Sequence, residues 1–399
     1  SNADVIPVRV VIVTLDAHIA TAVERARAEL APELPGLDLR LHAATGFDDP
    51  RAIEACCADI ARADIVFANM LFIEDHIRAV LPALEARRES CDAMVCAMSA
   101  GEVMRMTRLG GFRMDGTSKG PLALLKKLRG KSGGTSKDGG SGQMAALRLL
   151  PRLLRFVPGK AQDLRSYLLT LGYWISGSSE NIAALVRMLV TQYADGPRRT
   201  LRGTLDVAPP KEYPETGLYH PHIAGRITES LDALPRPSEP RGTIGLLLLR
   251  SYILADDAGH YDAVIAKLES QDLRVVPAFA SGLDARPAIE KFFVRDGHAT
   301  VDVVVSLTGF SLVGGPAFND AKAAEEILAR LDVPYVAAQP LEFQSVGQWK
   351  ASSHGLSPSG SRSMPANHEL DGATGPSVFG GRDCGAEGIR GPPMGGSDD

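Results

Sequence analysis

The 399-residue sequence has few aromatic residues and no long apolar run. Phenylalanine, tryptophan and tyrosine make up 6% of the chain, whereas 45% of its residues are hydrophobic. Its cores must therefore be built mainly from aliphatic side chains, which are numerous enough for at least two packed domains. The longest apolar runs, such as Ile244 to Leu249, have the length of a strand and fall far short of the ~20 residues that cross a bilayer. No transmembrane helix is expected.

The sequence also lacks a strong charge imbalance and a paired cysteine motif. Its 43 basic and 48 acidic residues leave a formal charge of −5, too little to demand a nucleic-acid partner. The five cysteines show no C-x-x-C spacing; they are Cys56, Cys57, Cys91, Cys96 and Cys384. We interpret them as reduced thiols of a cytoplasmic protein. The opening Ser1-Asn2-Ala3 has no initiator Met and no basic segment, and we interpret it as a cloning scar.

Strand-like and helix-like stretches alternate over residues 4–114. Examples in order are VRVVIVTL, AHIATAVERARAEL and LDLRLHAA. This alternation predicts a mostly parallel sheet covered on both faces, in a Rossmann-like or flavodoxin-like α/β domain. The loop that follows the first strand, Leu15 to His18, has no G-x-G-x-x-G pattern, so no dinucleotide site is expected there.

Residues 115–142 interrupt this alternation with a basic, glycine-rich stretch. Six basic residues lie between Lys119 and Lys137. Gly130-Lys131-Ser132 resembles the end of a P-loop, but that motif needs a glycine at position 125, where this chain has leucine. We therefore expect a flexible basic loop here, and no nucleotide site.

The rest of the chain is expected to form three further segments. Residues 143–240 combine helical periodicity with a proline-rich connection, and Ser178 or Ser179 is placed to cap a helix. Residues 241–350 alternate strand and helix again, which predicts a second parallel-sheet α/β domain joined to the first by the helical segment. Residues 351–399 are rich in glycine, serine and proline and are expected to be an irregular or disordered tail.

Several ordered strings resemble the H subunit family of magnesium chelatase, which is related to the large subunit of cobaltochelatase. They are FVPGKAQDLRSYLLTLGYWISGSSENIAALVRML, RSYILADDAGHYDAVIAKLE, VVVSLTGFSLVGGPAFNDAKAAEEILARLDVPY and PLEFQSVGQW. The resemblance runs from about Val8 to about Trp349 and looks like an amino-terminal portion of a longer polypeptide. It implies binding of protoporphyrin IX, into which Mg²⁺ is inserted while AAA+ partner subunits, I and D, hydrolyse ATP. The pathway would be bacteriochlorophyll or chlorophyll synthesis.

The resemblance leaves three functions open for this portion. It can contribute to enclosing the porphyrin for chelation, although catalysis by the portion alone is not expected. It can be a non-catalytic module that carries a tetrapyrrole or docks the motor subunits. It can also come from a cobaltochelatase large subunit, whose substrate is a corrin precursor. No resident cofactor or metal of its own is expected.

The densest polar group follows a predicted strand and includes Arg250, Asp257 and His260. Metal insertion requires two pyrrole N–H protons to leave the porphyrin, and a histidine beside carboxylates can accept a proton. We therefore name His260 and Asp257 as candidate catalytic residues and Arg250 as a candidate substrate-binding residue. The alternative is structural: an aspartate caps the next helix and His260 packs beside Tyr261.

Glycines surround a short apolar stretch after the strand VDVVVSL. Thr308-Gly309 and Gly314-Gly315 would permit tight turns or the close approach of a flat ligand. Because ligands of open α/β sheets sit beyond the carboxyl ends of the strands, these four are candidate substrate-binding residues. A plain crossover loop is the alternative.

Overall fold

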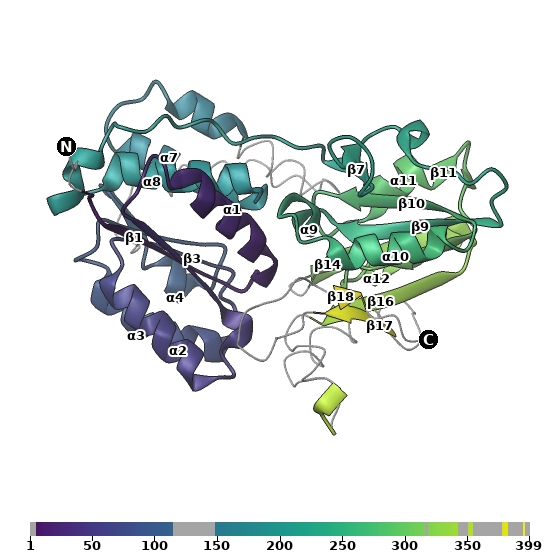
Figure 1. The fold of residues 1–399 in the computed structure, drawn as a ribbon, viewed down its shortest axis with the longest axis horizontal. Coiled ribbons are helices and arrows are strands. Elements are labelled where there is room, and N and C mark those ends of the chain that lie inside the picture. Colours follow the sequence, from purple (N-terminus) through teal and green to yellow (C-terminus); the bar gives the residue numbers. More distant parts are fainter. Residues whose placement is uncertain are drawn as a thin grey trace. The chain divides into compact units, whose positions relative to one another are not determined.

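The computed structural model describes residues 5–114, 148–315, 318–341, 350–353, 377–381 and 394–395. The chain divides into unit 1, Ser1–Glu212, and unit 2, Tyr213–Asp399 (Figure 1). Each unit holds one large sheet with helices on both faces, which confirms the predicted α/β class with two sheet-containing domains. The expected basic loop at 115–142 lies outside the described residues.

The sheet of unit 1 has six strands in the order β2-β1-β3-β4-β5-β6. Their bounds are β1 Val8–Thr14, β2 Leu37–Ala43, β3 Ile65–Asn69, β4 Ala93–Ala97, β5 Arg108–Leu109 and β6 Phe112–Arg113. The first four strands are parallel and the last two are antiparallel. The order 2-1-3-4-5 is that of flavodoxin-like sheets, in which the winding reverses between β1 and β3.

Helices cover both faces of this sheet because its central strands are apolar on both sides. They are α1 Ala20–Leu30, α2 Pro50–Arg62, α3 Glu74–Arg87, α4 Gly101–Met104, α7 Lys160–Ile175 and α8 Ser179–Tyr193, with 3-10 turns η1 Ala17–Ile19, η2 Ala44–Gly46 and η3 Gly196–Leu201. Val11 and Val13 share a core with α2 and α3. On the other face the Phe67 ring meets the Trp174 ring of α7 edge to face, 5.1 Å between centroids.

The predicted helices between the two sheets are present, and they pack on unit 1. Helix α8 has ten buried residues among its fifteen, so it needs neighbours on most sides, and it lies against α1 and α7. The Ser178 Oγ accepts a hydrogen bond from the Asn181 N–H at 3.3 Å, which confirms the predicted cap. The proline-rich connection is shared between the two units, because the residues after Glu212 belong to unit 2.

The sheet of unit 2 has eight strands in the order β18-β17-β16-β13-β9-β10-β7-β8. Their bounds are β7 Thr216–Tyr219, β8 Ile227–Thr228, β9 Gly242–Leu249, β10 Leu273–Ala280, β13 Val303–Ser306, β16 Tyr335–Leu341, β17 Ser377–Gly381 and β18 Met394–Gly395. The run β10-β9-β13-β16-β17 is parallel and repeats the order 2-1-3-4-5 of unit 1. The two units therefore share one winding order.

Two of these strands correct the expectation of a wholly irregular tail. β17 and β18 lie between residues 377 and 395, where the sequence shows no extended alternation of apolar and polar residues. They exist because β17 adds to the edge of β16 and β18 adds to β17. Pairing with a distant strand supplies the backbone hydrogen bonds that the local sequence does not specify.

Unit 2 also has helices on both faces of its sheet. They are α9 Arg250–Leu254, α10 Gly259–Glu269, α11 Arg286–Phe292 and α12 Ala321–Leu331, with the turn η4 Leu231–Ala233 and two small hairpins, β11 Val294–Arg295 with β12 His298–Ala299 and β14 Gly314–Gly315 with β15 Phe318–Asn319. One core lies under α11 and α12, and the other under α9 and α10. Within the described part of the chain, no helix is both long enough and apolar enough to span a bilayer.

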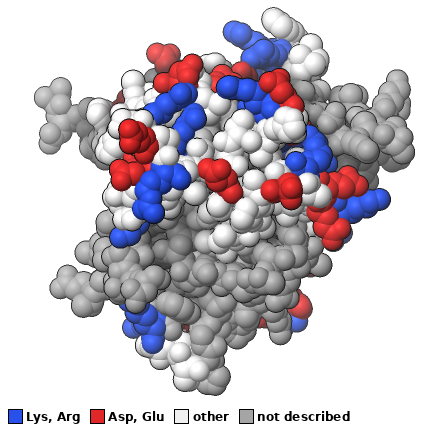
Figure 2. Space-filling view, turned by 90° about the vertical axis from the view of Figure 1, so that its right-hand side faces the viewer, with Lys and Arg blue, Asp and Glu red and all other residues white. Residues whose placement is uncertain are grey.

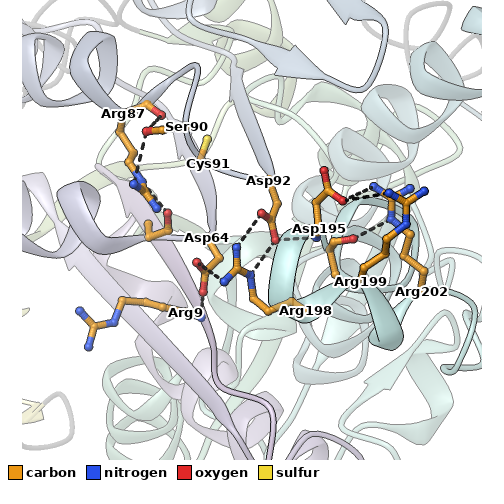
Figure 3. Close-up of polar contacts among 12 residues, drawn as sticks. Arg9, Asp64, Arg87, Ser90, Cys91, Asp92, Asp195, Arg198, Arg199 and Arg202 are labelled. Atoms are coloured by element: carbon orange, nitrogen blue, oxygen red, sulfur yellow. Dashed lines mark hydrogen bonds and ion pairs between the residues drawn. The ribbon is translucent and has the colours of Figure 1, made fainter.

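An ion-pair network ties η3 to the amino edge of the unit 1 sheet (Figure 3). The Arg198 guanidinium donates to the Asp92 carboxylate through Nε at 2.9 Å and Nη2 at 2.8 Å, and its Nη1 lies 3.2 Å from Asp64. Asp64 also accepts a hydrogen bond from the Arg9 N–H at 2.8 Å. Because Asp64 and Asp92 directly precede β3 and β4, one arginine joins two neighbouring strands.

Candidate functional site

A hollow lies at the carboxyl edge of the unit 2 sheet. It is formed by residues 247–249 of β9, residues 278–280 of β10 with the chain that follows it, and the end of β13 with the chain that follows it. This is the point at which the winding of the sheet reverses, between β9 and β13. In open α/β sheets ligands bind at this position. The hollow is therefore the candidate site of unit 2.

The lining of the hollow is apolar with three hydroxyl groups. The hydroxyls belong to Ser306, Thr308 and Ser311, and none of the lining residues is ionisable. Thr308 is held in place, because its Oγ1 lies 3.1 Å from the Ser306 Oγ and accepts the Phe310 N–H at 3.1 Å. Such a lining suits an uncharged, flat or aliphatic group that makes few hydrogen bonds. The enclosed volume is only about 20 Å³, so the hollow can receive no more than the rim of a large ligand.

The loop that follows β13 forms one wall of the hollow, and two backbone hydrogen bonds fix it. The Ala285 N–H donates to the Leu312 carbonyl at 2.8 Å, and the Gly314 N–H donates to the Leu283 carbonyl at 2.9 Å. Of the predicted residues, Thr308 lines the hollow, and Gly309 makes the turn beside it with φ +74°. That backbone conformation favours glycine. Gly314 and Gly315 form the strand β14 and do not line the hollow.

The other predicted residues lie in α9, in the loop after it and in α10, outside the lining of the hollow. Arg250 is buried and its Nη2 donates to the Tyr213 carbonyl at 3.1 Å. Asp257 and His260 are also buried. The His260 ring packs against two tyrosine rings, with centroids 5.2 Å from Tyr252 and 4.1 Å from Tyr261. None of these three predicted residues lines the hollow.

A second polar network in unit 2 was not foreseen from the sequence. Arg226 pairs with Asp256 and lies 3.4 Å from Asp262, and the Tyr219 hydroxyl donates to Asp262 at 2.6 Å. Burial, together with the neighbouring Asp262 carboxylate, raises the pKa of Tyr219. The partners come from β7, the turn before β8, the loop after α9 and α10, and their wide separation in sequence leaves no local pattern to detect. The network fastens the antiparallel strands to α10.

At the equivalent position in unit 1, the side chains of Thr14 and Asn69 are fully buried. Thr14 and Asn69 face each other across the ends of β1 and β3, and the Thr14 Oγ1 donates to the Asn69 Oδ1 at 2.8 Å. The Asp16 N–H in turn donates to the Thr14 Oγ1 at 3.0 Å. Burial raises the pKa of the Asp16 carboxyl to about 6, although a hydrogen bond from Trp174 acts in the opposite direction. Sequence inspection did not single out Asp16.

The described residues show no metal-ligand cluster, and one face of the molecule carries charges of both signs. No three of their His, Cys, Asp and Glu side chains come together in a way that could hold a metal ion. Figure 2 shows a face on which lysine and arginine are interspersed with aspartate and glutamate. That face offers no patch of one sign for a polyanion.

Two family models match successive parts of the chain. Residues 9–168 match a domain of unknown function, DUF3479, and residues 171–392 match the family described as CobN/Magnesium Chelatase. The chain is 50% identical over 378 residues to the magnesium chelatase H subunit of Rhodobacter capsulatus, covering 94% of this chain and 31% of that protein. It is 35% identical over 398 residues to the chloroplastic magnesium chelatase ChlH protein of Oryza sativa subsp. indica, covering 94% and 28%.

One solved structure aligns with most of the chain. The "Catalytic Subunit of Cobaltochelatase from Mycobacterium tuberculosis" aligns with a TM-score of 0.48 and 18% sequence identity, over 97% of this chain and 26% of that one. Like the R. capsulatus match at 31%, this leaves most of the relative uncovered, so the chain spans about a third or less of the lengths of the proteins that it matches.

Proposed function

Because the chain belongs to the CobN/magnesium chelatase family, we propose that it is the amino-terminal part of a subunit that holds protoporphyrin IX during insertion of Mg²⁺. The main support is the 50% identity that extends along 94% of the chain to a magnesium chelatase H subunit. The magnesium branch is favoured over cobaltochelatase by that identity. The whole subunit would serve bacteriochlorophyll or chlorophyll synthesis, and this portion would not catalyse chelation alone.

We assign ATP hydrolysis to AAA+ partners, the I and D subunits, and not to this chain. The Gly130-Lys131-Ser132 segment lacks the first glycine of a P-loop, since position 125 is leucine. A cytoplasmic location is also proposed. It is supported by the four described cysteines, Cys56, Cys57, Cys91 and Cys96, which are free thiols.

Within the chain, we place the tetrapyrrole contact at the hollow of unit 2. Its apolar lining and its Ser306, Thr308 and Ser311 hydroxyls suit the edge of a flat, largely apolar ring. Thr308 and Gly309 would lie against the ring. Arg250, Gly314 and Gly315 would act only by supporting the strand ends and the loop, because they do not line the hollow.

Substituting Gly282 with phenylalanine is expected to weaken porphyrin binding at least about ten-fold, a difference of about 1.4 kcal/mol. Gly282 lines the hollow, and a Cβ built on it has its nearest neighbour, the Asp284 backbone nitrogen, at 4.0 Å. The backbone can therefore accept a side chain there, and the ring would occupy ligand space. The measurement is a titration of the chain with deuteroporphyrin IX, followed by the Soret shift and by tryptophan quenching.

The matched control is Gly46→Phe in unit 1, because Gly46 is exposed and a Cβ there meets nothing within 4 Å. Equal affinity of the two variants would remove the hollow from the binding site. Absence of any Soret shift with the unmodified chain would remove tetrapyrrole binding from this portion and favour the alternative of a subunit-docking module. Tighter binding of a corrin precursor than of porphyrin would favour cobaltochelatase.

The assignment of His260 and Asp257 to proton removal stays a prediction. The packing of His260 between Tyr252 and Tyr261 supports the structural alternative. His260→Ala in the full-length subunit, assayed with its partners, separates the two. A proton acceptor predicts a lower chelation rate at near-normal porphyrin affinity, and an unchanged rate would end the catalytic assignment.

A further inference from the structure

Three arginine side chains gather at the amino end of the unit 2 sheet. Arg274 is the second residue of β10, Arg236 follows η4, and Arg295 lies in the hairpin β11–β12. Asp232 forms an ion pair with Arg236 at 2.9 Å. The charges of the other three residues all act on the Arg274 guanidinium. Three cations and one anion therefore share this place, with a local charge of +2.

The packing of unit 2 brings the three elements to one face of its sheet. Side chains alternate between the two faces along a strand, so Arg274 lies on the same face as Val276. Val276 belongs to the core under α11 and α12. Leu234, which follows η4, and Val294 of the hairpin pack in that core as well. The arginines therefore come from neighbouring elements, although they are far apart in the sequence.

Arg274 is half-buried, and its charge is not balanced by the side chains around it. Its Nε is buried and has no hydrogen-bond partner among the described residues. Arg295 is exposed and forms no ion pair in the part of the chain that the structure describes. Burial, together with Arg236 and Arg295, lowers the pKa of Arg274, and Asp232 acts in the opposite direction. Excess positive charge with an unused buried donor is the condition under which an anion binds.

We propose that Arg236, Arg274 and Arg295 form a binding site for one phosphate group, either free phosphate or the phosphate of a small monoester. A phosphate dianion matches the local charge of +2. Its oxygens can accept hydrogen bonds from guanidinium groups that approach from three different elements. A carboxylate fits less well, because it has one negative charge and its two oxygens are already satisfied by a single arginine.

This site is separate from the hollow proposed for the tetrapyrrole. The hollow begins on β10 at Ala278, four residues after Arg274, which is about 13 Å along the strand. None of the residues that line the hollow is ionisable, whereas charged side chains make up the phosphate site. Either site can therefore fail its test without affecting the other.

The test is a calorimetric titration of the chain with inorganic phosphate at constant ionic strength and about pH 7.5, where phosphate is mainly a dianion. Arg274→Met should weaken phosphate binding at least about ten-fold, because it keeps the unbranched stem and removes the charged fork. Arg295→Gln should weaken it several-fold. Arg295 is exposed, so this second variant does not depend on the packing of the core. The matched control is Lys267→Met, at an exposed position of α10 on the other face of the sheet, and it should leave binding unchanged.

Titrations with glycerol 2-phosphate and with acetate identify the anion. Binding of both inorganic phosphate and glycerol 2-phosphate would support a site for monoesters, and binding of inorganic phosphate alone would support a site for the free anion. Acetate that binds as tightly as phosphate would overturn the phosphate assignment. The proposal would also be overturned if phosphate did not bind, or if Arg274→Met and Arg295→Gln both bound it as tightly as Lys267→Met. Arg274 would then have a structural role, in which its aliphatic stem covers the edge of the core.

Discussion

Replacement of Arg198 by methionine is expected to lower the free energy of unfolding of unit 1 by about 3 kcal/mol. The side chain of Arg198 is 18% exposed and that of its partner Asp92 is 5% exposed. Removing the guanidinium leaves the Asp92 carboxylate inside the protein without a cation, and Asp64 loses its contact as well. The loss of stability comes mainly from this uncompensated charge. In the intact pair, the attraction between the two charges is little larger than the free energy needed to remove them from water.

The measurement is denaturant unfolding followed by Trp174 fluorescence in a Trp349→Phe background, which leaves Trp174 as the single tryptophan of the chain. The neighbouring Arg199→Met is the control. Arg199 is 71% exposed and 3.6 Å from Asp195, and an exposed pair of this kind contributes only about 0.5 kcal/mol. Adding Asp92→Asn to Arg198→Met should recover part of the loss. Equal destabilisation by the two arginine variants would contradict a buried network.

Replacement of Asp16 by asparagine is expected to stabilise unit 1 at neutral pH by up to about 3 kcal/mol. Burial raises the pKa of this carboxyl from 3.8 to about 6 in the folded chain. Asparagine keeps the size of the side chain and an oxygen that can accept the Trp174 N–H, but it carries no charge to desolvate. The gain should vanish near pH 4, where the aspartic acid is protonated in the folded state.

The direction of the pH dependence follows from proton uptake. Between pH 4 and 6 the folded chain holds a proton on Asp16 that the unfolded chain has lost, so stability falls as pH rises through this window. In the Asp16→Asn variant, this fall in the free energy of unfolding between pH 4 and 6 should be absent. Asp206→Asn, at an exposed position of the same unit, is the control. A slope that is the same in wild type and Asp16→Asn would show that Asp16 ionises normally.

The sequence predicted best those elements whose signals are local. The string LRVVPAFA coincides with β10, Leu273–Ala280, and SENIAALVRMLVTQY coincides with α8, Ser179–Tyr193, because apolar periodicity and a serine cap mark them. The strands β7 and β17 were missed. Both lie in proline-rich or glycine-rich sequence and exist through pairing with distant strands, β10 and β16, which no local window contains.

The candidate site was predicted in part for the same reason. Thr308 and Gly309 directly follow an apolar strand, so the rule that ligands lie beyond strand ends placed them at the hollow. The part of the lining contributed by β9 and β10 could not be predicted, because its apolar residues look like those of any buried strand in the sequence. His260 was grouped with Arg250 by proximity in the chain, yet its neighbours in the fold are tyrosine rings.

The repeated strand order makes the two sheets comparable position by position. Thr14 opposite Asn69 in unit 1 corresponds to Leu247 opposite Ser306 in unit 2. The first pair is buried and joined by a hydrogen bond, and the second pair lines the hollow. Two domains with the same winding order can therefore differ in use. The strand ends of unit 1 can be rigid and structural, while the strand ends of unit 2 can change in sequence to fit a ligand.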